Sequence, residues 1–335
     1  MPPEWAPHER TWMEFPPANA TFGDDPDGDL GRARRAWSAV VNAVAEFEPV
    51  SLICDIGDAA AARALVDPVT IHETAIDESW FRDSGPTFLT HPSGRLGAVH
   101  WRFNGWGQQD FCDWHDEQHT GAFAAELAGA EVFRSTMVNE GGGIHVDGEG
   151  TVLVTRTVQL DPDRNPGWGE DAVEAELTSQ LGVDKVLWLP RGLTKDYERY
   201  GTRGHIDMIA AFVRPGLVVA HSQPDTSHPD HDVCRENIAV LRSSSDARGR
   251  RLEVVELAAP TVTHTDEGIV DWSYVNHYLC NGAVILCAFD DPRDKEAAET
   301  LGRLHPGREV RLVDARPIFD GGGGIHCITQ QEPAV

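Results

Sequence analysis

Five segments of the chain combine a polar or glycine-rich turn with a short apolar stretch, and they recur at similar intervals. Their markers are Asp83, Glu140, His205, Asn276 and Cys327, which are separated by 57, 65, 71 and 51 residues. Recurrence at such a period is typical of proteins built from stacked or radially arranged repeats. The chain is therefore expected to fold as five roughly equal units.

Two of these segments share the phrase Gly-Gly-Gly-Ile-His. It occurs at residues 141–145 and again, after one more glycine, at 322–326. Glu140 precedes the first copy, and Cys327 follows the second within a short strand-like apolar pattern. A repeated backbone that presents an acid in one place and a thiol in another indicates a site assembled from repeats.

Amphipathic helices are predicted between the markers, because apolar residues recur there at helical spacing. The expected helical ranges are 31–48, 121–127, 170–181, 230–243 and 294–304, and the expected strands include 50–55, 186–189 and 253–257. This alternation of strands and helices predicts an α/β or mixed α+β fold. No Pro- or Ser-rich linker divides the chain, so we expect a single domain over residues 1–335.

The net charge of −26 argues against a nucleic-acid partner and against anionic membrane surfaces, both of which need a basic face. An acidic protein can steer small cations toward a cleft. The polar N-terminus lacks the apolar core of a signal peptide, and the apolar runs are too short to span a bilayer. Six scattered cysteines indicate reduced thiols, so a cytoplasmic location is expected.

Cys327 is the candidate nucleophile. At an ordinary pKa near 8.5 only a few per cent of a thiol would be ionised at neutral pH, so its surroundings must favour the thiolate. The preceding glycine run, which includes Gly324, can turn backbone N–H groups toward a ligand and lets a substrate approach closely. The alternative is an inert buried cysteine near a C-terminal strand.

A histidine and three acids can complete such a site. His205 and Asp207 would face the same side of a strand, and a histidine beside a carboxylate can serve as a general acid or base. Asp83 and Glu140 each stand just before a glycine and a strand. Gathered carboxylates suit a planar guanidinium, which offers its N–H donors in a fork. The alternative is that these acids only close turns.

Two groups of histidines raise the alternative of a metal site. His115 and His119 have the spacing of a zinc-binding helix, but Asp116 stands where that pattern requires glutamate. His221, His228 and His231 lie in a polar, loop-like stretch. We expect neither group to bind metal, and no motif for a nucleotide or another organic cofactor is present.

The sequence around the reactive residues resembles the agmatine deiminase family, which includes bacterial-type peptidylarginine deiminases. The resemblance runs from residue 2 to residue 333. The motifs that carry it are Trp80-Phe81-Arg82-Asp83-Ser84-Gly85-Pro86, Glu140-Gly141-Gly142-x-Ile144-His145-x-Asp147-Gly148, Gly204-His205-Ile206-Asp207 and Gly322 through Gln331. It implies the pentein fold, a five-bladed α/β propeller with pseudo-fivefold repeats, acting as a C–N hydrolase without metal or organic cofactor.

The resemblance also implies roles for individual residues. Cys327 is the expected nucleophile, His205 the general acid/base, and Asp83 and Asp207 the guanidinium clamp. Glu140 is the expected third acid, in contact with the guanidinium or handling protons. The expected substrate is a small cationic guanidine, above all agmatine, converted through a thiouronium intermediate on Cys327. Trp80, Asp83, Asp207, Arg203 and Gly324 are the residues expected to bind it.

One departure from the family pattern leaves the substrate's tail open. Gly201 and Arg203 stand where the family tends to place acids, so a carboxylate tail, as in arginine or 4-guanidinobutyrate, is an alternative to the ammonium of agmatine. An amidinotransferase on the same fold, a zinc hydrolase using His115 and His119, and a non-catalytic binding propeller are further alternatives. Homo-oligomers are common among resembling proteins, so self-association is also possible.

Overall fold

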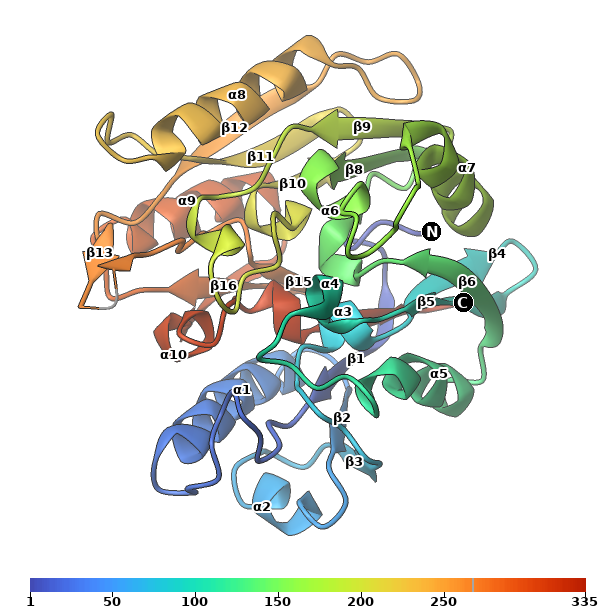
Figure 1. The fold of residues 1–335 in the computed structure, drawn as a ribbon, viewed down its shortest axis with the longest axis vertical. Helices are drawn as coiled ribbons and strands as arrows, with labels where there is room; N and C mark the ends of the chain where they lie inside the picture. Colours follow the sequence, from blue (N-terminus) through green and yellow to red (C-terminus); the bar gives the residue numbers. More distant parts are fainter. Residues whose placement is uncertain (267) are drawn as a thin grey trace.

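The structure is a computed structural model that describes residues 1–266 and 268–335 (Figure 1). Five sheets repeat one arrangement, in which the first strand runs antiparallel to the second and the second runs parallel to the third. The strands, sheet by sheet, are β4 Thr87–His91, β5 Arg95–Arg102 and β6 Glu131–Val138; β7 His145–Val146, β8 Thr151–Thr155 and β9 Lys185–Leu189; β10 Ala210–Arg214, β11 Leu217–Ser222 and β12 Glu253–Ala258; β15 Tyr278–Cys280, β16 Ala283–Ala288 and β17 Glu309–Asp314; and β18 Gln330–Pro333, β1 His8–Glu14 and β2 Val50–Cys54, to which β3 Thr70–Glu73 is added. The predicted α/β class with fivefold repetition is confirmed.

A helix follows the second strand of every repeat. Parallel neighbours cannot be joined by a tight turn, so the chain crosses back through these helices. They are α1 Asp29–Ala45, α5 Glu117–Leu127, α7 Glu170–Leu181, α8 Asp230–Ser243 and α9 Asp294–Leu304. Figure 1 shows α1, α5, α7 and α8 toward the outside of the molecule and α3 near its middle. Each predicted helix overlaps one of these five helices. The periodic apolar residues on which the predictions rested, such as Trp37 and Val41 of α1, are buried in the core.

Shorter elements complete the fold. They are α2 Ala59–Arg63, α4 Gly105–Gln108, α6 Arg156–Gln159, α10 Arg316–Phe319, η2 Lys195–Tyr197 and the antiparallel pair of β13 His264–Thr265 and β14 Gly268–Ile269. Among the residues that the structure describes, no helix is both long and apolar enough to cross a membrane.

Four short helical turns meet where the repeats converge. They are α3 Phe81–Ser84, η1 Gly141–Gly143, η3 Ile206–Met208 and η4 His326–Ile328. α3 contacts η1 and η4, and η1 contacts η3. The expected strands at His205 and Cys327 are wrong, because both segments form 3₁₀ turns. Side chains take up the local backbone donors instead of a strand ladder: Thr202 Oγ1 accepts from the His205 N–H (3.1 Å), and Asn276 Oδ1 accepts from the His326 N–H (3.0 Å).

The two ends of the chain build one repeat together. β18 pairs antiparallel with β1, with Gln330 opposite Trp12 and Pro333 opposite His8. Trp12 Nε1 also donates to Glu332 Oε2 at 2.7 Å. This pairing brings the segment that carries Cys327 beside the first residues of the chain.

Candidate active site

Cys327 is buried in η4, with 3% of its surface exposed. Asn276 Nδ2 donates to its Sγ at 3.2 Å, and the thiol donates to Asp207 Oδ2 at 3.6 Å. Burial and the negative charges of Asp207 and Asp83 raise the pKa of the thiol well above its ordinary value. A hydrogen bond from the Gly324 backbone acts to lower the pKa but does not outweigh them. The unliganded protein therefore holds Cys327 as a thiol, and ionisation needs a positive charge beside it.

His205 lies between two carboxylates. Its Nε2 is 3.3 Å from Glu140 Oε2, and its Nδ1 is 3.6 Å from Asp83 Oδ1. Burial alone would lower the pKa of the imidazole, but Asp83 and Glu140 outweigh burial and raise the pKa to about 9. His205 is thus an imidazolium at neutral pH, able to donate a proton.

Gly142 occupies the point at which these groups converge. Its N–H donates to Asp83 Oδ1 at 3.0 Å. A Cβ at this position would lie 2.5 Å from His205 Nδ1, 2.8 Å from Asp83 Oδ1 and 3.0 Å from Asp207 Oδ2. The histidine and two of the predicted acids therefore surround one small space, and the Asp207 carboxylate links that space to Cys327.

We expect Gly142→Ala to lower kcat/KM by about 100-fold or more, because one misplaced methyl group would push the imidazole and the clamp apart. Gly143→Ala is the matched control: its Cβ would meet nothing closer than 3.3 Å, and the neighbours are Gln159 and Val158. Steady-state kinetics with thermal denaturation checks the pair. Equal activity of the two variants would contradict this geometry.

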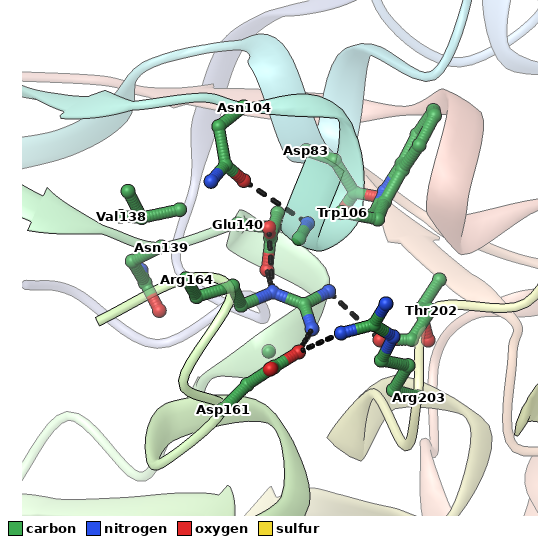
Figure 2. Close-up of polar contacts among 12 residues, drawn as sticks. Asp83, Asn104, Trp106, Val138, Asn139, Glu140, Asp161, Arg164, Thr202 and Arg203 are labelled. Carbon is green, nitrogen blue, oxygen red and sulfur yellow. Dashed lines mark hydrogen bonds and ion pairs between the residues drawn. The ribbon is translucent and has the colours of Figure 1, made fainter. Parts of the chain in front are cut away.

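Glu140 is held by a cation that sequence reasoning missed. Arg164 Nε donates to both carboxylate oxygens, at 2.9 and 3.0 Å, and Arg164 Nη1 donates to Asp161 Oδ2 at 2.8 Å (Figure 2). Burial raises the pKa of Glu140, but Arg164 and His205 outweigh it and lower the pKa to about 2. Glu140 therefore stays ionised beside His205. Arg164 lies in the Pro- and Gly-containing stretch 161–167, outside every motif that the sequence offered for the site.

The side chain of Arg203 pairs with acids outside the predicted set of site residues. Its Nη1 donates to Asp161 Oδ2 at 2.8 Å, so its charge is shared with the network around Arg164 (Figure 2). The same Nη1 also donates to Asp163 Oδ2 at 2.8 Å. A guanidinium engaged by two carboxylates is a poor partner for the tail of a substrate. The prediction that Arg203 contacts substrate has no support in this geometry.

Asp83 is fixed by donors on two sides, since Trp106 Nε1 donates to its Oδ2 at 2.9 Å opposite the Gly142 N–H. The pKa of Asp83 is raised to about 6, mainly by burial. The charge of His205 acts to lower this pKa, and the charge of Asp207 acts to raise it. Asp83 is therefore ionised at neutral pH and becomes protonated in mildly acidic solution.

Asp207 is held by His326, the histidine of the repeated phrase. His326 Nδ1 is 2.8 Å from Asp207 Oδ2, and its Nε2 is 2.9 Å from Glu4 Oε2. Burial would raise the pKa of Asp207, but His326 outweighs it and lowers the pKa. Asp207 Oδ1 and His205 Nδ1 are buried atoms with no hydrogen-bond partner in the described parts of the chain. Each can therefore form a hydrogen bond with a group that enters the site.

The two copies of the repeated phrase meet at Glu4. His145 Nε2 is 3.8 Å from Glu4 Oε2, and the rings of His145 and His326 are stacked with centroids 6.3 Å apart. The repeat could have pointed to these histidines, whereas nothing in the sequence beyond the family resemblance signals Glu4. Asn276 marked a repeat, but no contact with the thiol was predicted for it.

Trp80 and Gly324 lie beside the candidate nucleophile, Cys327. The Trp80 ring would lie 2.8 Å from a Cβ at Gly323, and that same Cβ would lie 3.0 Å from Cys327 Sγ. A Cβ at Gly324 would be 2.5 Å from Asn276 Oδ1. Glycines are therefore required where the chain passes between the indole, the amide and the thiol.

The described residues contain no group of three or more His, Cys, Asp and Glu side chains that could hold a metal ion. His115 and His119 are exposed, and α5 begins only at Glu117. The two histidines are therefore not one turn apart on a helical face, which the zinc alternative requires.

A buried thiol, an imidazolium and three carboxylates on five α/β repeats are the features of the penteins, enzymes that modify guanidino groups. A family model described as Porphyromonas-type peptidyl-arginine deiminase matches residues 1–333. The chain belongs to this family, and the resemblance seen in the sequence is confirmed. It is thus a hydrolase acting on the C–N bonds of guanidino groups.

Individual relatives are similar to this chain over nearly their whole lengths. A Streptomyces avermitilis protein provisionally named agmatine deiminase is 56% identical over 336 residues, covering 99% of this chain and 96% of that protein. The agmatine deiminase of Stutzerimonas stutzeri is 38% identical over 358 residues, covering 100% and 95%. The solved structure of Enterococcus faecalis agmatine deiminase matches with a TM-score of 0.92 at 30% identity, covering 100% of this chain and 95% of that one.

Proposed function

We propose that the protein is an agmatine deiminase, which hydrolyses agmatine to N-carbamoylputrescine and ammonia. The observation that carries the proposal is the convergence of His205, Asp83 and Asp207 on the space at Gly142, with Cys327 hydrogen-bonded to Asp207. A planar cation bound against the Asp83 and Asp207 carboxylates that converge there would meet negative charge on two sides, with the Cys327 sulfur next to one of them. The names of the relatives supply agmatine as the first substrate to test.

Substrate binding would prepare the nucleophile. Asp207 and Asp83 raise the pKa of the Cys327 thiol, and a guanidinium bound between them would cancel their negative charge. The thiol then loses its proton to solvent, and the thiolate is formed beside the amidino carbon. His205 cannot be the base for this step at neutral pH, because it is already protonated.

The chemistry then needs two proton transfers by one imidazole. Sulfur attacks the amidino carbon, and His205 donates its proton to the departing nitrogen, which leaves as ammonia. The neutral imidazole next takes a proton from water, whose hydroxide attacks the thiouronium carbon. Collapse of this second adduct breaks the C–S bond and turns its C–OH into the ureido C=O. The hydroxyl proton passes to solvent, where the released ammonia takes it up as ammonium, and the thiolate and the imidazolium are restored.

The test is an assay of agmatine, arginine and 4-guanidinobutyrate for ureido product and ammonia, without an acceptor amine. We expect agmatine to have the highest kcat/KM and ammonia to be released in equal amount to product. Arginine or 4-guanidinobutyrate as the best substrate would contradict the proposal. Turnover only in the presence of an acceptor amine would identify an amidinotransferase.

Other features support predictions about the setting. We propose one domain over residues 1–335, since strands from both chain ends share a sheet. The charge of −26 supports a small cationic partner rather than nucleic acid or an anionic membrane, and the six cysteines are free and buried, which supports the reducing cytoplasm. Self-association stays a prediction to be measured by light scattering.

A further inference from the structure

A cleft of about 180 Å³ opens beside the glycine run that precedes the nucleophile. Gly322, Tyr200, Gly201 and Phe319 line it, and Asp271 lies in its wall. Gly322 is bonded to Gly323, whose Cβ position is 3.0 Å from Cys327 Sγ. Consecutive Cα atoms are about 3.8 Å apart, so the cleft begins within reach of a short aliphatic chain whose other end is at the thiol.

Asp271 is a buried carboxylate without a partner. It is 7% exposed, and it makes no hydrogen bond or ion pair with another of the residues that the structure describes beyond an interaction with its own backbone. Burying an unpaired carboxylate costs free energy, which a bound cation would offset. Burial raises the pKa of Asp271 to about 7. The charges of Asp196 and Asp230 also raise this pKa, and the charge of Lys195 lowers it. The charged residues that line the cleft together with Asp271 are Lys195, Glu198, Arg199 and Asp320.

Most of the other charges of the cleft are already engaged or lie in solvent. Asp320 pairs with Arg32 at 2.6 Å, and Arg199 lies over the Tyr200 ring at 4.9 Å. Gly201 cannot supply a side chain, because a Cβ there would be 2.2 Å from the Asp196 carbonyl oxygen. The acid facing the cleft from the interior is therefore Asp271.

We propose that Asp271 binds the ammonium group at the tail of the substrate and selects amines over carboxylates. This inference rests on the proposed function, because it requires that the guanidinium is bound at Cys327. Asp271, rather than Arg203, is then the residue that selects which charged group the tail of the substrate carries. Lys195, half-buried in the same cleft, is the group that would favour a carboxylate if the proposal were wrong.

The test compares three substrates: agmatine, butylguanidine, which has the same chain without the ammonium, and 4-guanidinobutyrate. We expect Asp271→Asn to lower kcat/KM for agmatine by about 100-fold, mainly through KM, because a desolvated ion pair is lost. For butylguanidine, kcat/KM should differ by less than about threefold between Asp271→Asn and the wild type. The ratio of kcat/KM for butylguanidine to kcat/KM for agmatine should therefore be higher in Asp271→Asn. Asp232→Asn, an exposed acid on α8 outside the cleft, is the control and should leave all three rates unchanged.

Two results would overturn the proposal: unchanged agmatine kinetics in Asp271→Asn, or an equal loss with butylguanidine. Folding should not obscure the outcome, because the substitution removes an unpaired buried charge and is expected to preserve thermal stability. If the wild type does not turn over agmatine, the proposed function fails separately. Calorimetric binding of agmatine to Cys327→Ser, with and without Asp271→Asn, then still tests the ammonium site, and equal affinities would refute it.

Discussion

Cys327→Ser is expected to lower kcat by about 10⁴-fold or more while the fold is retained. An alcohol in this site is a far weaker nucleophile than a thiolate, and the neighbouring Asp207 and Asp83 disfavour an anion at this position until the guanidinium is bound. Size is not the cause, because serine is no larger than cysteine. Initial rates with agmatine, measured against thermal denaturation curves, give the result.

The matched control is Cys234→Ser, another buried cysteine, on α8. It should retain activity, since no site group contacts it in the described structure. Mass spectrometry of quenched reactions should find an amidino adduct on the wild type and none on Cys327→Ser. A serine variant with full turnover would mean that sulfur does not attack, and the non-catalytic or metal-dependent alternatives would return.

The fold could be predicted because its signals are periodic and local. Helices such as α1 and α9 place apolar residues at helical spacing, and the markers recur in every repeat. The turns at His205 and Cys327 could not be predicted in this way. Their backbone donors are taken by Thr202 and Asn276, and such contacts are decided by tertiary structure.

In the candidate site, too, some residues could be predicted from local sequence patterns and others depend on tertiary contacts. Glu140 and Cys327 could be found because they flank the two copies of one glycine-rich phrase, and Asp83, His205 and Asp207 because they lie within three residues of a glycine at a repeat marker. Their supports could not, since they come from distant parts of the chain. Arg164 lies in an irregular turn, and Glu4 reaches His326 only because β18 pairs with β1.

His205→Gln is expected to lower kcat with agmatine by about 10³-fold, because both proton transfers would lose their general acid and base. The loss should not reflect misfolding, since glutamine can still donate to Glu140 from the same position. His115→Gln is the control, and full activity there would separate His205 from the exposed histidines of the zinc alternative. If His115→Gln is inactive and His205→Gln is active, the roles assigned here are wrong.

The pH profile distinguishes a proton donor from a residue that only positions others. The pKa of His205 is raised to about 9, so it is charged below this pH, and kcat/KM of the wild type should fall as pH rises through about 9. The pKa of Asp83 is raised to about 6, so kcat/KM with butylguanidine, which has no ammonium for Asp271 to bind, should also fall as pH drops through about 6, when one carboxylate beside the guanidinium is neutralised. In His205→Gln the alkaline limb should disappear. The acid limb should move to higher pH, because the imidazolium no longer lowers the pKa of Asp83. An unchanged alkaline limb in this variant would show that His205 does not supply the proton to ammonia.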